Sequence, residues 1–375
     1  MRIVVAPDSF KGGPSAGAVA AALAEGWRRA RPHDAVVAVP LADGGEGTID
    51  ALRASVTGAT VHPVTAVTGP DGEPTDVEFL LLPDGTAVVE LARSSGLPLM
   101  ARPDPLNATT RGLGQVLAAT LDCGAPRVLV GVGGSASTDG GAGALAALGL
   151  RLTDESGAVL RDGGAGLTAL ANIDGVRLRP PPVGGVEVLS DVSSPLLGPS
   201  GAAAVFGPQK GATAAQVDVL EQGLARWAHL LGGVPDAAGA GAAGGTAYGL
   251  AAMWGATIVS GSAAVARAAG LDEELRQADI VLSGEGAFDA TSLRGKVVGG
   301  VLEKARRLGL PVCIVAGSIE AHAAQSVTAT ISTTDLAGSR AASLAEPERF
   351  LRQAGELLAR SADTLVATWR DRTCS

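Results

Sequence analysis

Residues 2–30, RIVVAPDSFKGGPSAGAVAAALAEGWRRA, contain in order a short apolar run, a polar loop and a stretch with helical spacing. The apolar run Arg2–Ala6 predicts a strand, and the recurrence of apolar residues from Ser15 to Ala30 predicts a helix. Ser15 is of the residue type that caps helix N-termini. A second apolar run, 35–40, leads through LADGGEGT into another helical stretch. The start of the chain therefore predicts two successive βα units.

The C-terminal part of the chain repeats this order of elements. Asp279–Leu282 is strand-like, the polar segment SGEGAFDATSLRGK follows as a predicted loop, and residues 297–308 have helical spacing. A buried strand is predicted at 311–316, and a closing helix begins at about Glu346. Strands that alternate with helices indicate a parallel sheet with helices on its faces.

The middle of the chain has a different pattern. Val77, Phe79 and Leu81 alternate with other residues, a PDGT turn follows, and 87–91 returns as an apolar run, which predicts an antiparallel hairpin. Further strands are predicted at 127–132 and 186–189. We therefore predict an α/β fold with two domains. A doubly wound domain is formed by both chain ends, residues 1–66 and 281–375, and a mixed α/β domain, residues 67–280, is inserted into it.

Composition limits the classes of function. The 375 residues are 46% hydrophobic and only 3% aromatic, which predicts a core of Val, Leu, Ile and Ala. A net charge of −9 argues against nucleic acid or an anionic membrane as partner, and no apolar stretch approaches the ~20 residues that span a bilayer. The N-terminus does not have the pattern of a signal peptide, so we expect a cytoplasmic protein. The oligomeric state stays open, with a homodimer as one alternative. Cys123 and Cys313 are predicted to be inert core thiols, and the cysteines lack metal-ligand spacing.

Six polar loops, most of them rich in glycine, follow predicted strands or lie between predicted elements. They are APDSFKGG (6–13), PLADGGEGT (40–48), VGVGGSASTDGGAG (130–143), SDVSSPLLG (190–198), FGPQKG (206–211) and SGEGAFDATSLRGK (283–296). Loops of this kind lie at the carboxyl edge of an open parallel sheet, where ligands bind. Taken alone, each loop is explained by turn geometry, a helix cap or a solvated lysine. Together, their lysines and exposed backbone suit a phosphate, and their carboxylates suit Mg²⁺.

Other common chemistries are absent from the sequence. No Walker A pattern occurs, because Gly295-Lys296 is followed by Val297 and lacks the upstream glycine. No GxGxxG follows the first strand with an acidic residue at the expected distance, which argues against an NAD enzyme. All four histidines lie outside the polar loops, so neither a His-based triad nor a zinc site is expected.

Read together, the loops resemble the bacterial glycerate kinase family, of the glycerate 2-kinase type, over essentially the whole chain. The segments TTRGLG (109–114), GAAAVFGPQKGA (201–212) and GAGAAGG (239–245) match it too, in the same order and spacing. The resemblance implies a flavodoxin-like domain from both termini with an inserted α/β domain. It also implies transfer of phosphate from ATP to D-glycerate with Mg²⁺, giving 2-phosphoglycerate.

The resemblance implies roles for particular residues. Catalytic roles are implied for Asp191, Lys11, Lys210, Asp43 and Asp289, with Asp191 as general base or Mg²⁺ ligand. Substrate binding is implied for Asp8, Ser9, Arg111, Glu46 and Ser292, with Arg111 as a bidentate partner of the substrate carboxylate. Phosphate or nucleotide binding is implied for Gly133, Gly134, Ser135, Asp139, Glu285 and Lys296.

The sequence departs from the family's usual residues at several loop positions. Asn is usual where Thr138 and Ser194 stand, Arg where Ala287 stands, and Ser and Gln where Ala290 and Thr291 stand. These changes remove polar donors from the expected pocket. Two alternatives therefore stay open: an ATP-dependent kinase of another small hydroxy acid or biosynthetic intermediate, and a non-catalytic metabolite-binding protein on the same scaffold.

Overall fold

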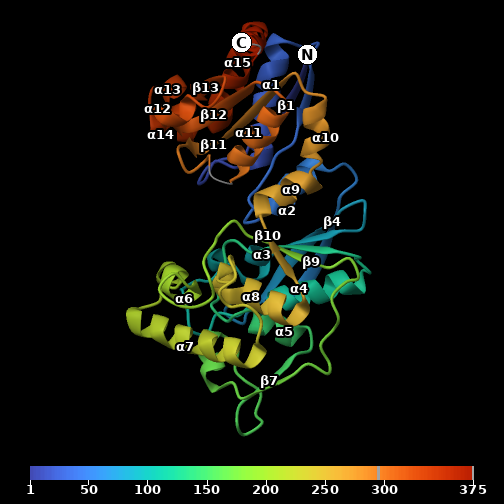
Figure 1. The fold of residues 1–375 in the computed structure, drawn as a ribbon, viewed down its shortest axis with the longest axis vertical. Helices are drawn as coiled ribbons and strands as arrows, with labels where there is room; N and C mark the ends of the chain where they lie inside the picture. Colours follow the sequence, from blue (N-terminus) through green and yellow to red (C-terminus); the bar gives the residue numbers. More distant parts are fainter. Residues whose placement is uncertain (294–295, 374–375) are drawn as a thin grey trace. The chain divides into compact units, whose positions relative to one another are not determined.

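The computed structural model describes residues 1–293 and 296–373, and the chain divides into two compact units (Figure 1). Unit 1 comprises Met1–Asp43, Asp50–Thr57 and Ser262–Ser375, and unit 2 comprises Gly44–Ile49 and Gly58–Gly261. The domain limits predicted above, at 66/67 and 280/281, stay a prediction. No helix in the described parts of the chain is long and apolar enough to cross a membrane.

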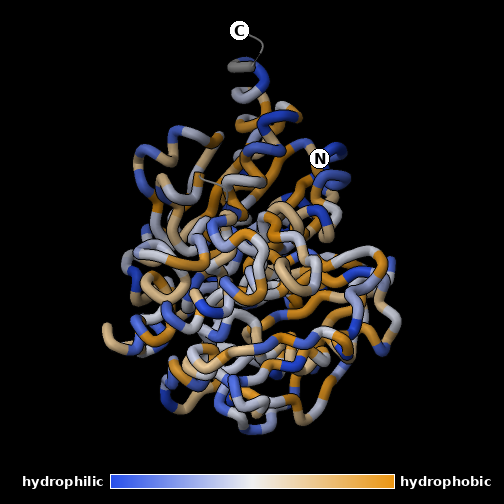
Figure 2. Tube along the Cα trace, turned by 60° about the horizontal axis from the view of Figure 1, so that its bottom comes forward, coloured by the Kyte–Doolittle hydropathy of each residue, from blue (hydrophilic) through white to orange (hydrophobic). Residues whose placement is uncertain are grey.

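Unit 1 is built on a five-stranded parallel sheet in the order β13-β12-β11-β1-β2. The strands are β1 (Arg2–Val5), β2 (Ala35–Ala38), β11 (Ile280–Phe288), β12 (Val312–Ile319) and β13 (Ala329–Ser332). This is the flavodoxin-like order, in which the direction of winding reverses between β1 and β11. The predicted fold class is confirmed. Residues 3–5, 280–282 and 312–316 of the three inner strands are buried, as expected where both faces of a sheet are covered, and Figure 2 shows hydrophobic and hydrophilic segments alternating along the chain.

The helices of unit 1 cover this sheet. They are α1 (Ala16–Ala30), α2 (Thr48–Ser55), α9 (Gly261–Ala268), α10 (Leu271–Arg276), α11 (Val297–Arg307), α12 (Ala321–Ala324), α13 (Thr333–Ala337), α14 (Arg340–Ala345) and α15 (Pro347–Thr373). Ser15 is the N-cap of α1, its hydroxyl accepting from the amide of Ala18, so the predicted cap is confirmed. Trp27 of α1 and Leu358 of α15 share one apolar core with Ile3 of β1.

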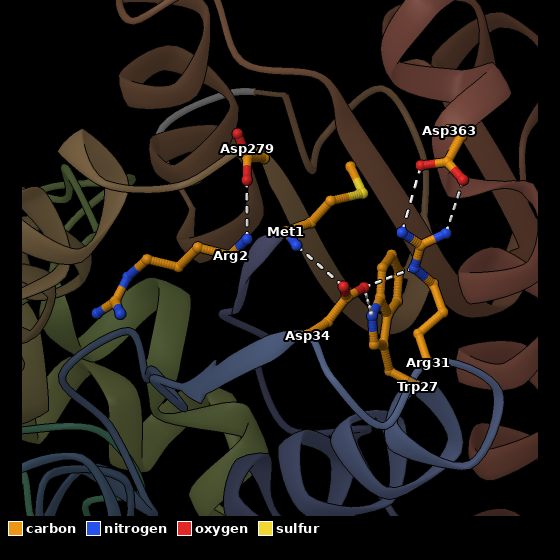
Figure 3. A network of polar contacts seen from close by, with 7 residues as sticks. All are labelled: Met1, Arg2, Trp27, Arg31, Asp34, Asp279 and Asp363. Carbon is orange, nitrogen blue, oxygen red and sulfur yellow. Dashed lines mark hydrogen bonds and ion pairs between the residues drawn. The ribbon is translucent and has the colours of Figure 1, made fainter.

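A polar network ties the beginning of the chain to α1 and α15 (Figure 3). The Asp34 carboxylate accepts hydrogen bonds from the Met1 amine at 2.9 Å, the Trp27 indole at 3.0 Å and Arg31 Nε at 2.6 Å. Arg31 also pairs with Asp363 of α15 at 2.8 Å. The network holds the ends at which β1 and β2 begin. The opposite ends of these strands lead into the candidate loops.

Unit 2 is built on a six-stranded mixed sheet in the order β10-β9-β6-β5-β4-β3 and a separate β7–β8 pair. The strands are β3 (Thr60–Thr68), β4 (Pro74–Leu81), β5 (Ala87–Glu90), β6 (Val128–Gly131), β7 (Arg151–Thr153), β8 (Asn172–Asp174), β9 (Val186–Leu189) and β10 (Thr257–Val259). β3, β4 and β5 pair antiparallel, so the predicted hairpin is confirmed. β5, β6, β9 and β10 are parallel, and their carboxyl ends share one edge of the sheet.

Six α-helices pack in the described part of unit 2. They are α3 (Leu91–Ser95), α4 (Arg111–Asp122), α5 (Ala142–Ala147), α6 (Ala202–Phe206), α7 (Ala214–Leu231) and α8 (Ala242–Trp254). Short 3-10 helices lie at Leu97–Leu99, Gly164–Ala169 and Pro208–Lys210. The core is mainly aliphatic, with Phe79, Trp227, Tyr248 and Trp254 as its large members. This matches the composition, which offers few aromatic residues.

Two details differ from the sequence expectations, at β11 and at Cys123, and the segment 237–247 adds a third detail. β11 does not end at Leu282 but continues to Phe288, because Gly284–Phe288 pair with Val315–Ile319 of β12. The segment 237–247 is a close backbone approach, since a Cβ on Gly244 would lie 2.2 Å from the Ser137 carbonyl oxygen. Cys313 is buried as predicted, but Cys123 is exposed, so the prediction of a core thiol there was wrong.

Candidate functional site

The carboxyl edge of the unit 1 sheet gathers polar residues from three strands. Asp8, Ser9 and Lys11 follow β1, and Asp43 follows β2. Glu285 lies on β11 itself, and Asp289, Ser292 and Lys296 come after it. Arg294 and Gly295 of the same predicted loop lie outside the described residues. The structure therefore brings these predicted site residues of unit 1 to one edge.

Burial and nearby negative charges raise the pKa of two of these carboxyl groups. Burial, together with the negative charge of Asp43, raises the pKa of Asp8 to about 6, against hydrogen bonds from Ser9 and the charge of Lys11. Burial, with the charges of Asp8 and Asp289, raises the pKa of Glu285 to about 7. Both groups therefore titrate close to neutral pH.

Asp289 and Ser292 mainly organise their own loop. The Asp289 carboxylate accepts from the Thr291 amide at 2.7 Å and the Thr291 hydroxyl at 2.6 Å. The pKa of Asp289 is lowered by these hydrogen bonds. The Ser292 hydroxyl is buried and donates to the Ala287 carbonyl at 3.2 Å. The catalytic role of Asp289 and the binding role of Ser292 stay predictions, and both residues shape the turn that follows β11.

In unit 2, the loop after β6 lies against the loop at 44–47. A Cβ on Gly133 would lie 2.6 Å from Gly45 Cα, and one on Gly134 would lie 2.3 Å from Glu46 Oε1. Gly134 has a φ of +71°, which favours glycine. The exposed Glu46 and the backbone of Gly133 and Gly134 therefore lie close together. Residues predicted to bind the substrate and the nucleotide of one reaction must be close in this way.

Asp139 is fully buried, and its carboxylate joins two helix N-termini. It accepts from the Thr110 amide at 2.9 Å and the Thr110 hydroxyl at 2.8 Å, just before α4. It also accepts from the amides of Gly141 at 3.1 Å and Gly143 at 3.2 Å, at the start of α5. Burial raises the pKa of Asp139, and the four donated hydrogen bonds oppose the rise. With these four donors on its oxygens, the carboxylate is a structural anchor for the loop that was predicted to bind phosphate.

Lys210 is buried beneath the same loop. Its ammonium group donates to the Ser137 carbonyl and, at 3.4 Å, to the Ser135 hydroxyl. Burial lowers the pKa of Lys210 to about 8, and the negative charge of Asp139 opposes the shift. Ser135 and Lys210, predicted in separate roles, are therefore brought together. The ammonium group lies under the loop, in contact with residues 135–137. Its positive charge therefore acts on the loop from the buried side.

Arg111 begins α4 and already has a carboxylate partner. Its Nε and Nη2 donate to the two oxygens of Asp162 at 2.6 and 2.7 Å in a bidentate pair. Both residues line a cavity of about 200 Å³ with Leu160 and Gly163. The sequence alone did not identify Asp162, because the segment RDGG resembles only a turn. A substrate carboxylate would have to share or displace this partner.

A double-mutant cycle tests the strength of this pair. Both side chains are about one-third exposed, so we expect a coupling free energy of about 0.5–1 kcal/mol between Arg111→Ala and Asp162→Ala. Urea unfolding of the wild type, the two single variants and the double variant measures it. Additive losses of stability would show that the pair does not form in solution.

Asp191 lies just after β9 and is exposed at the sheet edge of unit 2. Its Oδ1 accepts from the Ser260 hydroxyl at 2.8 Å and the Gly261 amide at 2.9 Å, so the carboxylate is held in one orientation. Among the described residues, no group of three or more His, Cys, Asp or Glu side chains is arranged to hold a metal ion. Proteins usually hold Mg²⁺ with one or two carboxylates and the phosphates of a nucleotide, so the Asp191 carboxylate has the chemistry of one such ligand.

A flavodoxin-like unit and a mixed α/β unit, each with polar loops at the carboxyl ends of parallel strands, define a two-unit α/β protein of the class that binds small molecules at these loops. The sequence model described as the glycerate kinase family matches residues 3–370. This chain belongs to the glycerate kinase family.

Individual relatives agree with this assignment. The chain is 44% identical over 331 residues to a glycerate kinase of Bacillus subtilis (strain 168), covering 85% of each chain. It is 42% identical over 328 residues to a glycerate 2-kinase of Escherichia coli (strain K12), covering 85% of this chain and 86% of that one. A crystal structure from Salmonella typhimurium LT2, provisionally designated glycerate kinase 2, superposes with a TM-score of 0.86 at 39% identity, covering 97% and 98% of the two chains.

Proposed function

We propose that this kinase transfers the γ-phosphoryl group of ATP to a hydroxyl group of D-glycerate and gives 2-phosphoglycerate. The observation that carries the proposal is the match to the glycerate kinase family over residues 3–370. Each unit has polar loops at the edge of its own sheet, with carboxylates and cations of the kinds that such a transfer needs. The cytoplasmic location and the homodimer stay predictions from the sequence.

The site residues have different proposed roles, which follow from their positions and charges. The backbone of Gly133 and Gly134 offers amides to phosphate oxygens, and the cation of Lys210 behind the loop adds positive potential there. Asp191, oriented by Ser260 and Gly261, would hold Mg²⁺. When bound, Mg²⁺ neutralises charge on the transferred phosphate. Catalysis in this class of reaction is mainly positioning and charge neutralisation.

A coupled ADP-release assay with Mg·ATP tests the proposal. D-Glycerate is compared with L-glycerate and a panel of other hydroxy acids and sugar acids, and ³¹P NMR identifies which hydroxyl is phosphorylated. We expect the highest kcat/KM with D-glycerate, and a loss of at least ~100-fold in kcat for Asp191→Ala. Asp154→Ala, which removes an exposed turn carboxylate in the same unit, is the matched control and should keep its turnover. Near wild-type turnover of Asp191→Ala would contradict the assigned role.

The substituted loop positions favour an alternative acceptor, a hydroxy acid larger than D-glycerate. Ala287 is exposed on β11, and Thr291 is exposed in the turn after it, where the family usually has longer polar side chains. Shorter side chains leave room for a bulkier acid. Poor turnover on D-glycerate with strong turnover on a larger hydroxy acid would establish this alternative, and no ADP release with any acceptor would favour a metabolite-binding protein.

A further inference from the structure

β1 and β11 lie side by side in the sheet of unit 1, and their parallel register pairs Val5 with Leu282. The ladder continues past the end of β1, because the Ala6 amide donates to the Leu282 carbonyl at 2.7 Å and the Asp8 amide donates to the Gly284 carbonyl at 2.8 Å. In this continued register Asp8 lies opposite Glu285, and side chains at opposed positions of neighbouring strands point to the same face of a sheet.

This pair lies at the point where the sheet reverses its direction of winding. The strand order β13-β12-β11-β1-β2 places the reversal between β1 and β11. In doubly wound sheets the crevice outside the carboxyl ends of these two strands is where ligands bind. On its other side Glu285 is paired with Ala316 of β12, a small buried residue without charge. The two carboxyl groups are therefore neighbours at the mouth of the expected crevice.

One carboxyl oxygen of Glu285 has no partner in the part of the chain that the structure describes. Its Oε1 is buried and has no hydrogen-bond partner among the described residues. A buried carboxyl oxygen without a partner costs free energy, which a bound donor would recover. Asp8 differs, because its Oδ1 accepts from the Ser9 amide at 2.6 Å and is held by its own loop.

We propose that Glu285 is the general base of the reaction and that Asp8 is a positioning residue that holds a negative charge beside it. This inference rests on the proposed function, since it needs an acceptor hydroxyl. That hydroxyl oxygen attacks the γ-phosphorus and forms the new O–P bond. The bond to the oxygen bridging the β-phosphorus breaks, its electron pair leaves on ADP, and the hydroxyl proton passes to Glu285 Oε1 and then to water.

The charged groups around the pair support this role. Asp43 after β2 and Asp289 after β11 add negative charge, while Lys11 and Lys296 oppose it. Burial is the main cause of both raised pKa values, about 6 for Asp8 and about 7 for Glu285, and the negative charge of Asp8 adds to the rise at Glu285. A base is most effective when its pKa lies near the working pH.

The pH dependence of kcat/KM for the acceptor is the first test. We expect wild-type kcat/KM to fall below neutrality with apparent pKa values between about 6 and 7. Glu285→Gln keeps the shape of the side chain and should lower kcat at least ~100-fold, with the KM for ATP nearly unchanged. Asp8→Asn removes the neighbouring charge and should move the acidic limb to lower pH by about 0.5–1. A Glu285→Gln variant with kcat within about tenfold of wild type, or an acidic limb that Asp8→Asn leaves in place, overturns the proposal.

Glu303→Gln is the matched control, because it makes the same change on the exposed surface of α11. It should leave the rate and the pH profile unchanged. Infrared difference spectra supply a readout that needs no activity: protonated-carboxyl bands should disappear between about pH 6 and pH 8, and Glu285→Gln should remove the component that titrates at about pH 7 and leave that of Asp8. If wild type shows the component at about pH 7 but phosphorylates neither glycerate nor any other acid, the proposed function fails while the raised pKa of Glu285 is confirmed. If the band change is absent, the pair itself is overturned.

Discussion

Replacing Asp139 with alanine is expected to destabilise the protein by about 4 kcal/mol or more. The substitution leaves four buried donors without an acceptor: the amide and hydroxyl of Thr110 and the amides of Gly141 and Gly143. Each buried donor left unsatisfied costs about 1–3 kcal/mol. The Thr110 hydroxyl also accepts from the Ala144 amide at 3.0 Å, so the N-termini of α4 and α5 lose a shared anchor. Urea unfolding followed by circular dichroism measures the loss.

Asp154 provides the control for burial. Its carboxylate also accepts several hydrogen bonds, from the Ser156 amide at 2.8 Å, the Ser156 hydroxyl at 2.6 Å and the Ala158 amide at 3.0 Å, but it is exposed. Water can replace it in Asp154→Ala, so a much smaller loss is expected. Equal losses for the two variants would mean that burial does not set the cost at Asp139.

The same Asp139→Ala variant should also affect Lys210. The charge of Asp139 opposes the effect of burial and holds the pKa of Lys210 up, at about 8. Without that charge the pKa falls further and more of the lysine is neutral at neutral pH. Positive potential behind the loop 133–137 would then decrease, and phosphate binding there should weaken beyond what the loss of stability explains.

Local patterns predicted the parts of the fold that local interactions determine. The strand at Arg2–Val5 and the helix ending at Ala30 were predicted within a residue or so, because apolar periodicity and the Ser15 cap lie within the segment itself. β11 was predicted too short, because SGEGAF has the composition of a loop. Its pairing with β12, a partner close in space but distant in sequence, makes it a strand.

In the candidate site, too, the sequence predicted what residue types determine and missed what tertiary contacts determine. The resemblance predicted Asp139 and Lys210 as site residues, but their burial depends on tertiary contacts that no motif records. The indole of Trp227, for example, donates to the Gly140 carbonyl at 3.0 Å and fixes the loop from α7. Glu285 was assigned to a loop and to phosphate binding, since its neighbour in space, Asp8, lies at the opposite end of the sequence. Only the sheet register brings the two carboxyl groups together.

The second large effect is expected at Gly249 of α8. A Cβ there would lie 2.1 Å from the Gly140 carbonyl oxygen, in the loop that Asp139 anchors. The contact is with backbone, which cannot rotate away as a side chain does, so α8 or the loop must move. We expect Gly249→Ala to lower the free energy of unfolding by about 3 kcal/mol and to weaken nucleotide binding, because the displaced loop carries the candidate phosphate amides.

Gly300 in α11 is the matched control for Gly249. It is also a helical glycine, but a Cβ there meets nothing within 4 Å. Gly300→Ala should therefore raise stability by about 0.5–1 kcal/mol, as alanine does at an unhindered helical site. Thermal unfolding of both variants with and without Mg·ATP separates the two effects. If Gly249→Ala is as stable as Gly300→Ala and binds nucleotide as wild type does, the close approach of α8 to the loop is not what positions the loop for phosphate.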